Sequence, residues 1–281
     1  MPQFSRREFI LAAAAGSVSL IAGTSSLLGA ELKKIPIGVQ LYSVRDDFPK
    51  DAPDVLAGIK KIGFEGVEFA GYADKSASEL RKLLDENGLK VCGSHMMGGL
   101  ADLRRDRLDR AVEFSKILGN DKLIVSITDS RTIEEYERHA DEFSAVAEKL
   151  KPYKMRIGCH NHTAEFQKID GQLPEFAFFD KASPDVFMQL DIGHCAHGGG
   201  DPVAVIKKYG DRLLSVHVKD WVPATGGDIV GEGIVKWPEV LAACAEAKAL
   251  QWYIVEEESD KFLGLGGIEK DFVNLTKLLQ S

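Results

Sequence analysis

Residues 186–220 read VFMQLDIGHCAHGGGDPVAVIKKYGDRLLSVHVKD and contain a complete strand–helix–strand pattern. Two runs rich in apolar and β-branched residues, Val186–Asp191 and Leu213–Val218, are typical of buried strands. Between them, Asp201-Pro202 is a helix start signal that opens the helical pattern Pro202–Tyr209. A strand, a helix and a second strand in this order predict parallel strands joined by a crossover helix.

The same alternation of short apolar runs and helical patterns continues on both sides of this stretch. The other expected strands are Ile35–Tyr42, Gly66–Phe69, Lys90–Ser94, Lys122–Ile127, Met155–His160 and Tyr253–Glu256. The other expected helices are Asp51–Ile62, Ser76–Asn87, Leu103–Leu118, Thr132–Leu150, Trp237–Ala247 and Ile268–Leu279. Strands that alternate with helices in this number, over about 250 residues, predict a closed (β/α)₈ TIM barrel, an α/β fold. An open doubly wound sheet is the competing arrangement, but the first strand lacks the Gly-x-Gly-x-x-Gly turn that binds a dinucleotide.

Residues 1–30 have the pattern of an export signal. Ser5-Arg6-Arg7-Glu8-Phe9 resembles the twin-arginine motif, and an uncharged run rich in alanine and serine follows from Leu11 to Leu28. We therefore expect a signal peptide over 1–30, recognition by the twin-arginine translocase, cleavage near Ala30 and a periplasmic barrel domain over 31–281. The alternative is an uncleaved N-terminal anchor; if the signal is cleaved, no stable membrane insertion is expected.

The composition is that of an ordinary globular chain, with 44% hydrophobic and 28% charged residues. The formal net charge of −8 argues against nucleic acid as a partner and favours a small ligand. The four cysteines are widely spaced without a Cys-x-x-Cys motif, which argues against a disulfide framework or a thiolate zinc site. The sequence leaves both a monomer and a homo-oligomer open.

Polar side chains collect where the expected strands end, which is the end of a TIM barrel that carries active sites. Six of the seven histidines lie in or just after a strand. Because side chains alternate along a strand, His160 and His162 share one side, as do His217 and Lys219. Imidazoles and carboxylates that converge there would suit a divalent metal such as Mn, Fe, Co or Zn better than calcium. The competing interpretation is that each histidine is a hydrogen-bonded core residue and each acid a helix cap or surface charge.

Seven motifs carry a family resemblance: Gly38-Val39-Gln40-Leu41-Tyr42-Ser43, Gly66-Val67-Glu68-Phe69, His160-Asn161-His162-Thr163-Ala164-Glu165-Phe166, Asp191-Ile192-Gly193-His194, His217-Val218-Lys219-Asp220, Gly231-Glu232-Gly233 and Val255-Glu256. With these motifs in this order, the chain resembles the sugar phosphate isomerase/epimerase superfamily, the xylose isomerase-like barrels. The resemblance implies one divalent metal ion, Mn, Co, Fe, Zn or Mg, held at the ends of strands five to eight.

The resemblance also implies the metal ligands. Asp191, His217 and Glu256 match three of the four ligands of the ketose epimerases. In those enzymes the strand-five ligand is a glutamate, which this chain lacks. We align His160 with that ligand and keep Glu165 as the reserve candidate.

The activity implied by the resemblance is isomerisation or epimerisation of a keto-sugar or related carbohydrate through an enediolate. In this hypothesis Glu256 or Glu68 is the general base. Lys219 polarises the substrate oxygen, and His162 donates or accepts a proton. The side chains expected to bind the substrate are Gln40, His95, His194 and Glu165.

Some of these side chains have simpler interpretations. Lys219 can instead form a salt bridge with Asp220 or Asp191. Glu257 and Glu258 are expected to be solvated or to cap a loop.

Three other activities remain open at this stage. An imidazole in place of one glutamate makes a dehydratase or lyase that acts on a keto-sugar, keto-glycoside or inosose the main alternative. A carbohydrate-binding barrel without catalysis is the alternative of another class. An endonuclease on abasic DNA belongs to the same superfamily, but the acidic charge and the export pattern argue against it.

Overall fold

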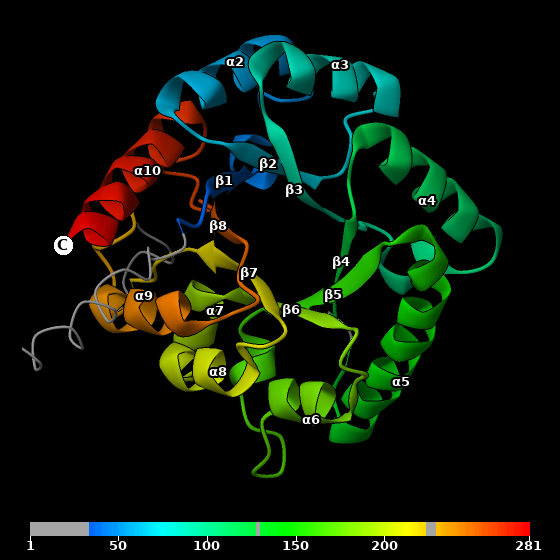
Figure 1. Cartoon of the computed structure of the whole chain (residues 1–281). Helices are drawn as coiled ribbons and strands as arrows, with labels where there is room; N and C mark the ends of the chain where they lie inside the picture. Colours follow the sequence, from blue (N-terminus) through cyan, green and yellow to red (C-terminus); the bar gives the residue numbers. More distant parts are fainter. Residues whose placement is uncertain (1–33, 128–129, 223–228) are drawn as a thin grey trace, which may run out of the picture. The chain divides into compact units, whose positions relative to one another are not determined.

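The computed structural model describes residues 34–127, 130–222 and 229–281. In these ranges the strands pair in chain order, the last strand pairs with the first, and all pairs are parallel, so the sheet closes into a barrel (Figure 1). The strands are β1 (Ile37–Gln40), β2 (Gly66–Ala70), β3 (Lys90–His95), β4 (Lys122–Ser126), β5 (Arg156–His160), β6 (Phe187–Asp191), β7 (Leu213–Val218) and β8 (Trp252–Val255). The predicted (β/α)₈ TIM barrel is confirmed.

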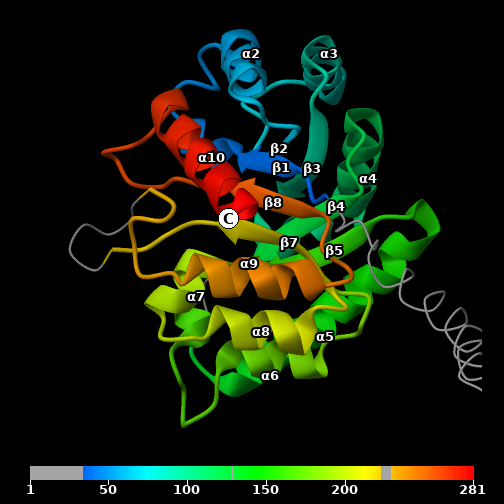
Figure 2. The same ribbon diagram turned by 60° about the vertical axis from the view of Figure 1, so that its left-hand side comes forward.

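Helices surround the barrel, and Figure 2 shows α8, α9 and α10 side by side on its outside. The helices are α2 (Ala52–Ile62), α3 (Ala77–Asn87), α4 (Asp106–Leu118), α5 (Ile133–Leu150), α6 (Pro174–Lys181), α7 (Ile192–His197), α8 (Pro202–Tyr209), α9 (Trp237–Glu246) and α10 (Leu265–Gln280). Short 3-10 turns are η1 (Leu41–Val44), η2 (Gly99–Leu103), η3 (Lys151–Tyr153) and η4 (Ala164–Phe166). Every predicted helix has a counterpart.

The sequence pattern does not predict α6 and α7, and the structure supplies the reason. In the short helix α6, Phe178, Phe179 and Glu175 are all buried, so the helix lacks the polar face that gives a clear helical period. Helix α7 begins directly after β6, because the side chain of Asp191 caps it from within the strand end.

Two predicted elements exceed the observed ones by more than one residue at an end. The first strand ends at Gln40 because its side-chain oxygen accepts a hydrogen bond from the backbone N–H of Tyr42 and turns the chain into η1. Helix α4 begins at Asp106 because η2 ends at Leu103, Arg104 is extended and Arg105 has a positive φ of 50°, which a helix does not allow.

In the interior of the barrel, the strand register places a small residue beside a large one. Gly158 of β5 pairs with Phe187 of β6, and the next pair on the same side is His160 with Gln189. A Cβ atom at position 158 would overlap the ring of Phe187. The aromatic ring therefore fills the space that the glycine leaves, and polar side chains follow toward the carboxyl ends of the strands.

The predicted signal peptide lies outside the described residues, so the export signal and the domain boundary at residue 30 stay predictions. Within the part that the structure describes, no helix is both long and apolar enough to span a membrane.

Candidate metal centre

Four potential metal ligands converge at the carboxyl ends of neighbouring strands. His160, Asp191, His217 and Glu256 each offer one donor atom, and these four atoms lie within 4.8 Å of one another. All four residues are buried. Metal–ligand bonds of about 2.0–2.2 Å bring donor atoms within roughly 4.4 Å of one another. Small side-chain rotations are thus sufficient for the group to close on one ion, and its N/O donor set suits a divalent transition metal.

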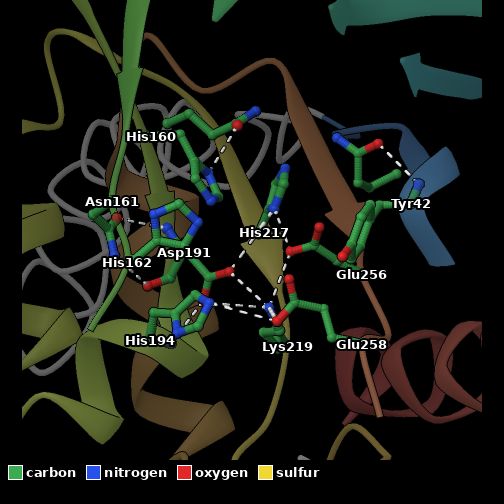
Figure 3. Close-up of polar contacts among 12 residues, drawn as sticks. Tyr42, His160, Asn161, His162, Asp191, His194, His217, Lys219, Glu256 and Glu258 are labelled. Atoms are coloured by element: carbon green, nitrogen blue, oxygen red, sulfur yellow. Dashed lines mark hydrogen bonds and ion pairs between the residues drawn. The ribbon is translucent and has the colours of Figure 1, made fainter. Parts of the chain in front are cut away.

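The end of β6 holds Asp191 in place from two sides. Its backbone N–H donates to Asn161 Oδ1 at 2.8 Å, and Asn161 Nδ2 donates to the Asp191 carbonyl at 3.2 Å, which ties β5 to β6. One carboxylate oxygen, Oδ1, accepts a hydrogen bond from His194 N at 2.7 Å. The other oxygen, Oδ2, is therefore the one directed at Lys219 and His217 (Figure 3).

His217 lies between two carboxylates. Its Nδ1 is 3.0 Å from Glu256 Oε2, and its Nε2 is 2.7 Å from Glu68 Oε1. Burial lowers the pKa of His217, but Glu256 and Glu68 outweigh burial and raise it to about 10. Since a carboxylate only accepts hydrogen bonds, both nitrogens carry a proton when no ion is bound. Nδ1, which faces Glu256 and Asp191, would release its proton to bind an ion, while Nε2 keeps its hydrogen bond to Glu68.

A layer of buried polar groups lies beside these donors, with Glu68 at its centre. Glu68 is completely buried and accepts hydrogen bonds from Gln40, His95, Gln189 and His217, at 2.7–3.0 Å. Burial raises the pKa of Glu68, but His217 and His95 lower it to about 2. Glu68 is therefore an ionised acceptor whose oxygens are already occupied.

Gln189 is the site residue that the sequence patterns do not reveal. Its Nε2 donates to Glu68 Oε2 at 2.7 Å, so its Oε1 must face the imidazoles of His95 and His160, at 2.9 and 3.0 Å. His160 therefore donates from Nδ1 and keeps Nε2 for a metal ion. Burial and three neighbouring imidazoles hold the pKa of His160 well below its usual range, so its ring is neutral. The available signal was a glutamine inside an apolar strand, two residues before Asp191.

Lys219 lies among three carboxylates. Its Nζ is 3.1 Å from Glu256 Oε2, 3.5 Å from Asp191 Oδ2 and 2.5 Å from Glu258 Oε2 (Figure 3). Burial lowers the pKa of Lys219, but these carboxylates outweigh burial and raise it. The side chain is thus a permanent hydrogen-bond donor, and it also contacts His194 Nε2 at 3.3 Å.

Of the two expectations for neighbouring acids, the one for Glu258 needs correction. Glu258 is not a solvated surface charge, because it contacts Lys219 and lines the cavity described below. Glu257 is buried and accepts a hydrogen bond from Ser259 N, which confirms the expectation that it caps its loop.

Of the two salt bridges suggested for Lys219, the one with Asp191 forms, at 3.5 Å, and the one with Asp220 does not. The carboxylate of Asp220 accepts four hydrogen bonds from the segment that follows β7, donated by Trp221 N, Gly231 N, Val235 N and Trp237 Nε1. Asp220 therefore fixes the loop that follows β7, whereas Lys219 contacts the carboxylates of the metal centre.

The side chains of His162 and Glu165 lie in different environments. The imidazole of His162 lines the cavity, and burial lowers its pKa, so the ring is neutral near pH 7. Glu165 is buried and accepts hydrogen bonds from the His162 backbone N–H at 2.7 Å and from Tyr136 Oη at 3.0 Å. Among the described residues it is not one of the four grouped donors, so the geometry favours His160 as the strand-five ligand.

A cavity of about 620 Å³ opens over this group. Of the predicted site residues, its lining includes Gln40, His95, His160, His162 and Glu256. The other predicted residues, Glu68, Glu165, Asp191, His194, His217 and Lys219, are not among the lining residues that the structure describes. A small polar molecule in this cavity would meet two neutral imidazoles and the carboxylate of Glu256 beside the donor group.

Comparison with known proteins supports the same fold. The family model of the xylose isomerase-like TIM barrel matches residues 56–278. The rhizopine catabolism protein MocC of Rhizobium meliloti is 24% identical over 85% of this chain and 84% of its own length. An inosose dehydratase of Serratia proteamaculans is 22% identical over 72% of this chain and 80% of its own length. The solved structure of a sugar phosphate isomerase/epimerase from Parabacteroides distasonis has a TM-score of 0.74 and 21% identity, covering 87% of this chain and 98% of that chain.

Proposed function

Because this chain belongs to the xylose isomerase-like TIM barrel family, we propose that it is a divalent-metal-dependent enzyme that isomerises or epimerises a keto-sugar. One observation carries the proposal: four buried N/O donors from consecutive strands converge beside a cavity lined by polar side chains. The ligands would be His160, Asp191, His217 and Glu256, with Mn, Co, Fe, Zn or Mg as the ion.

Enolisation of a keto-sugar needs a base at one carbon and stabilised negative charge on the carbonyl oxygen. A divalent ion at the donor group would polarise the carbonyl and stabilise that charge. Glu256 is the base in this proposal, because its carboxylate is ionised and lines the cavity. Lys219 is a fixed cation that donates a hydrogen bond to the developing oxyanion.

His162 completes the proton transfer, since its neutral ring faces the cavity and its side chain makes no hydrogen bond that the structure shows. Glu68 is a positioning residue rather than a second base, because its oxygens accept four hydrogen bonds and are closed to solvent. His95 and His194 are proposed to bind substrate hydroxyls, together with Gln40.

A dehydratase is the second candidate, and the imidazole at position 160 favours it. Symmetric proton transfer by two metal-bound glutamates is not available when His160 replaces one of them. Dehydration begins with the same enolisation; the C–O bond of a neighbouring hydroxyl then breaks, and this hydroxyl leaves as water with the proton that the base removed, so a single base is sufficient. The relatives named inosose dehydratases support this candidate.

Proton exchange tests both candidates together. The full chain, loaded with Mn²⁺ or Co²⁺, is incubated with keto-sugars and inososes in D₂O and followed by NMR. Deuterium at the carbon beside the carbonyl is expected in either case. An isomeric sugar identifies an isomerase or epimerase, and loss of water identifies a dehydratase.

Glu256→Gln is expected to lower the exchange rate by about 10²-fold or more. Glu269→Gln, at an exposed position of α10, is the matched control and should exchange at the parent rate. A metal-loaded protein that binds these sugars without exchange would instead be a carbohydrate-binding barrel.

The proposal includes export, which rests on the sequence pattern of residues 1–30. The full chain is expected in the periplasm after recognition by the twin-arginine translocase. Replacing Arg6 and Arg7 by lysine should retain it in the cytoplasm, as cell fractionation would show. Equal periplasmic amounts of both proteins would contradict this part.

A further inference from the structure

The cavity extends well beyond the metal donors. Its outer part, here called the distal arm, is lined by Met96, Met97, Leu100, Arg104, Glu142 and Phe143. These residues come from the chain that follows β3, from η2 and the residue after it, and from helix α5. Cavities of about 300–1,000 Å³ hold drug-sized ligands, which are about twice the size of one hexose. At about 620 Å³, this cavity has room for two sugar-sized units.

The distal arm has an apolar surface and one polar edge. Phe143, Leu100 and Met96 are buried around it, whereas Met97 is 67% exposed at its rim. The polar edge is an ion pair between Arg104 Nη2 and Glu142 Oε2 at 2.7 Å. A sugar ring has the same two kinds of surface, because its C–H groups are apolar and its hydroxyls donate and accept hydrogen bonds.

The charge of the distal arm indicates whether the second sugar-sized unit would be phosphorylated or uncharged. Arg104 is the one lysine or arginine among the described lining residues, and Glu142 neutralises it. Glu256 and Glu258 add negative charge to the rest of the lining. A phosphate group would find no unpaired lysine or arginine among the described residues of this surface, so the arm suits an uncharged unit.

We propose that the distal arm binds a second, uncharged hexose, so that the substrate is a keto-glycoside of two sugar units rather than a free or phosphorylated monosaccharide. This inference rests on the proposed function, because it takes the keto unit to lie at the metal donors. The second hexose would lie against Met97 and Leu100 and present its hydroxyls to Arg104 and Glu142.

Measuring the binding of sugars to the metal-loaded full chain tests the inference of a second hexose without requiring turnover. The probes are D-fructose, D-fructose 6-phosphate, lactulose and isomaltulose, the last two being fructose that carries a second hexose. Calorimetry should show at least one disaccharide bound about tenfold or more tightly than fructose, and the phosphate bound no more tightly than fructose. No gain for either disaccharide, including undetectable binding of all four sugars, overturns the inference.

Two variants then test whether the second hexose binds in the distal arm. Leu100→Trp fills the distal arm, and Arg104→Gln removes the guanidinium at an exposed position; each should reduce the disaccharide-to-fructose affinity ratio toward one. Ile117→Trp, on the exposed side of α4, is the control and should keep the ratio. An unchanged ratio in both arm variants overturns the inference. A clear disaccharide preference without proton exchange would instead contradict the proposed enzyme and leave the second subsite standing.

Discussion

Gln189 donates a hydrogen bond from Nε2 to Glu68 Oε2 across 2.7 Å, and this contact fixes which way the polar layer beside the donor group is oriented. Because Glu68 can only accept, the amide oxygen of Gln189 must face His160 Nδ1 and His95 Nε2. The same carboxylate accepts from His217 Nε2, which leaves Nδ1 as the nitrogen that can release its proton and bind an ion. Two side chains that would touch no metal ion therefore decide which ring nitrogens can bind one.

Replacing Gln189 tests this arrangement. Gln189→Leu should weaken Co²⁺ binding by about 10–100-fold, because the His160 ring loses the partner that fixes its tautomer. Competition titration measures the affinity, and imidazole ¹⁵N NMR of the metal-free protein reports the tautomer. Gln172→Leu, at an exposed position, is the control. Parent affinity together with an unchanged His160 tautomer would show that Gln189 has no positioning role.

Lys219 is expected to act in catalysis rather than in metal retention. Lys219→Met removes the fixed cation beside Glu256, and loss of one such donor typically costs about 10²–10³-fold in rate. Deuterium exchange should fall by this amount while metal content, measured by mass spectrometry, is retained. The exposed Lys168→Met serves as the comparison. Exchange at the parent rate in Lys219→Met would rule out the proposed role.

The buried Asp271 of α10 should make the free energy of unfolding depend on pH. Its Oδ1 accepts from Val230 N at 2.8 Å, whereas its buried Oδ2 has no partner. Burial, with smaller contributions from neighbouring acids, raises the pKa of Asp271 from 3.8 to about 8. The folded state therefore binds this proton more tightly than the unfolded chain. The contribution to stability is complete below about pH 4 and is lost as the pH rises toward 8.

Asp271→Asn keeps the acceptor for Val230 and cannot ionise. Near pH 8.5 it should raise the free energy of unfolding by about 1–3 kcal/mol, a few degrees in Tm, with a much smaller gain near pH 5. Thermal unfolding at both pH values measures this difference. Asp260→Asn alters a side chain that is 98% exposed and should show no such trend. An Asp271→Asn gain that is equal at both pH values would refute the prediction.

The loop held by Asp220 should not tolerate a side chain at Gly233. A Cβ atom at that position would overlap Asp220 Oδ1, so Gly233→Ala must displace the carboxylate that accepts four hydrogen bonds. We expect a loss of about 1–3 kcal/mol in the free energy of unfolding. Gly266→Ala has open space around its new methyl group and is the matched control. Equal melting temperatures of the two variants would contradict this account.

The sequence predicts the barrel well because strand and helix periods are local properties. Asp191, His217 and Glu256 could be found because each lies at or just after a strand end, where all parallel strands meet. Gln189 could not be assigned, since its role depends on the register between β6 and its neighbours, which no local pattern contains. The distal arm is also invisible in sequence, because α5 and η2 come together only in the folded barrel.

Metal content is the most direct test of the central claim that four buried side chains bind one divalent ion. The full chain, incubated with Co²⁺ or Mn²⁺ and freed of excess metal, should retain about one equivalent per chain by mass spectrometry. The double variant Asp191→Asn/Glu256→Gln should retain almost none, while Glu269→Gln retains the parent amount. A parent protein that retains no metal, or a double variant that retains as much as the parent, would contradict the account.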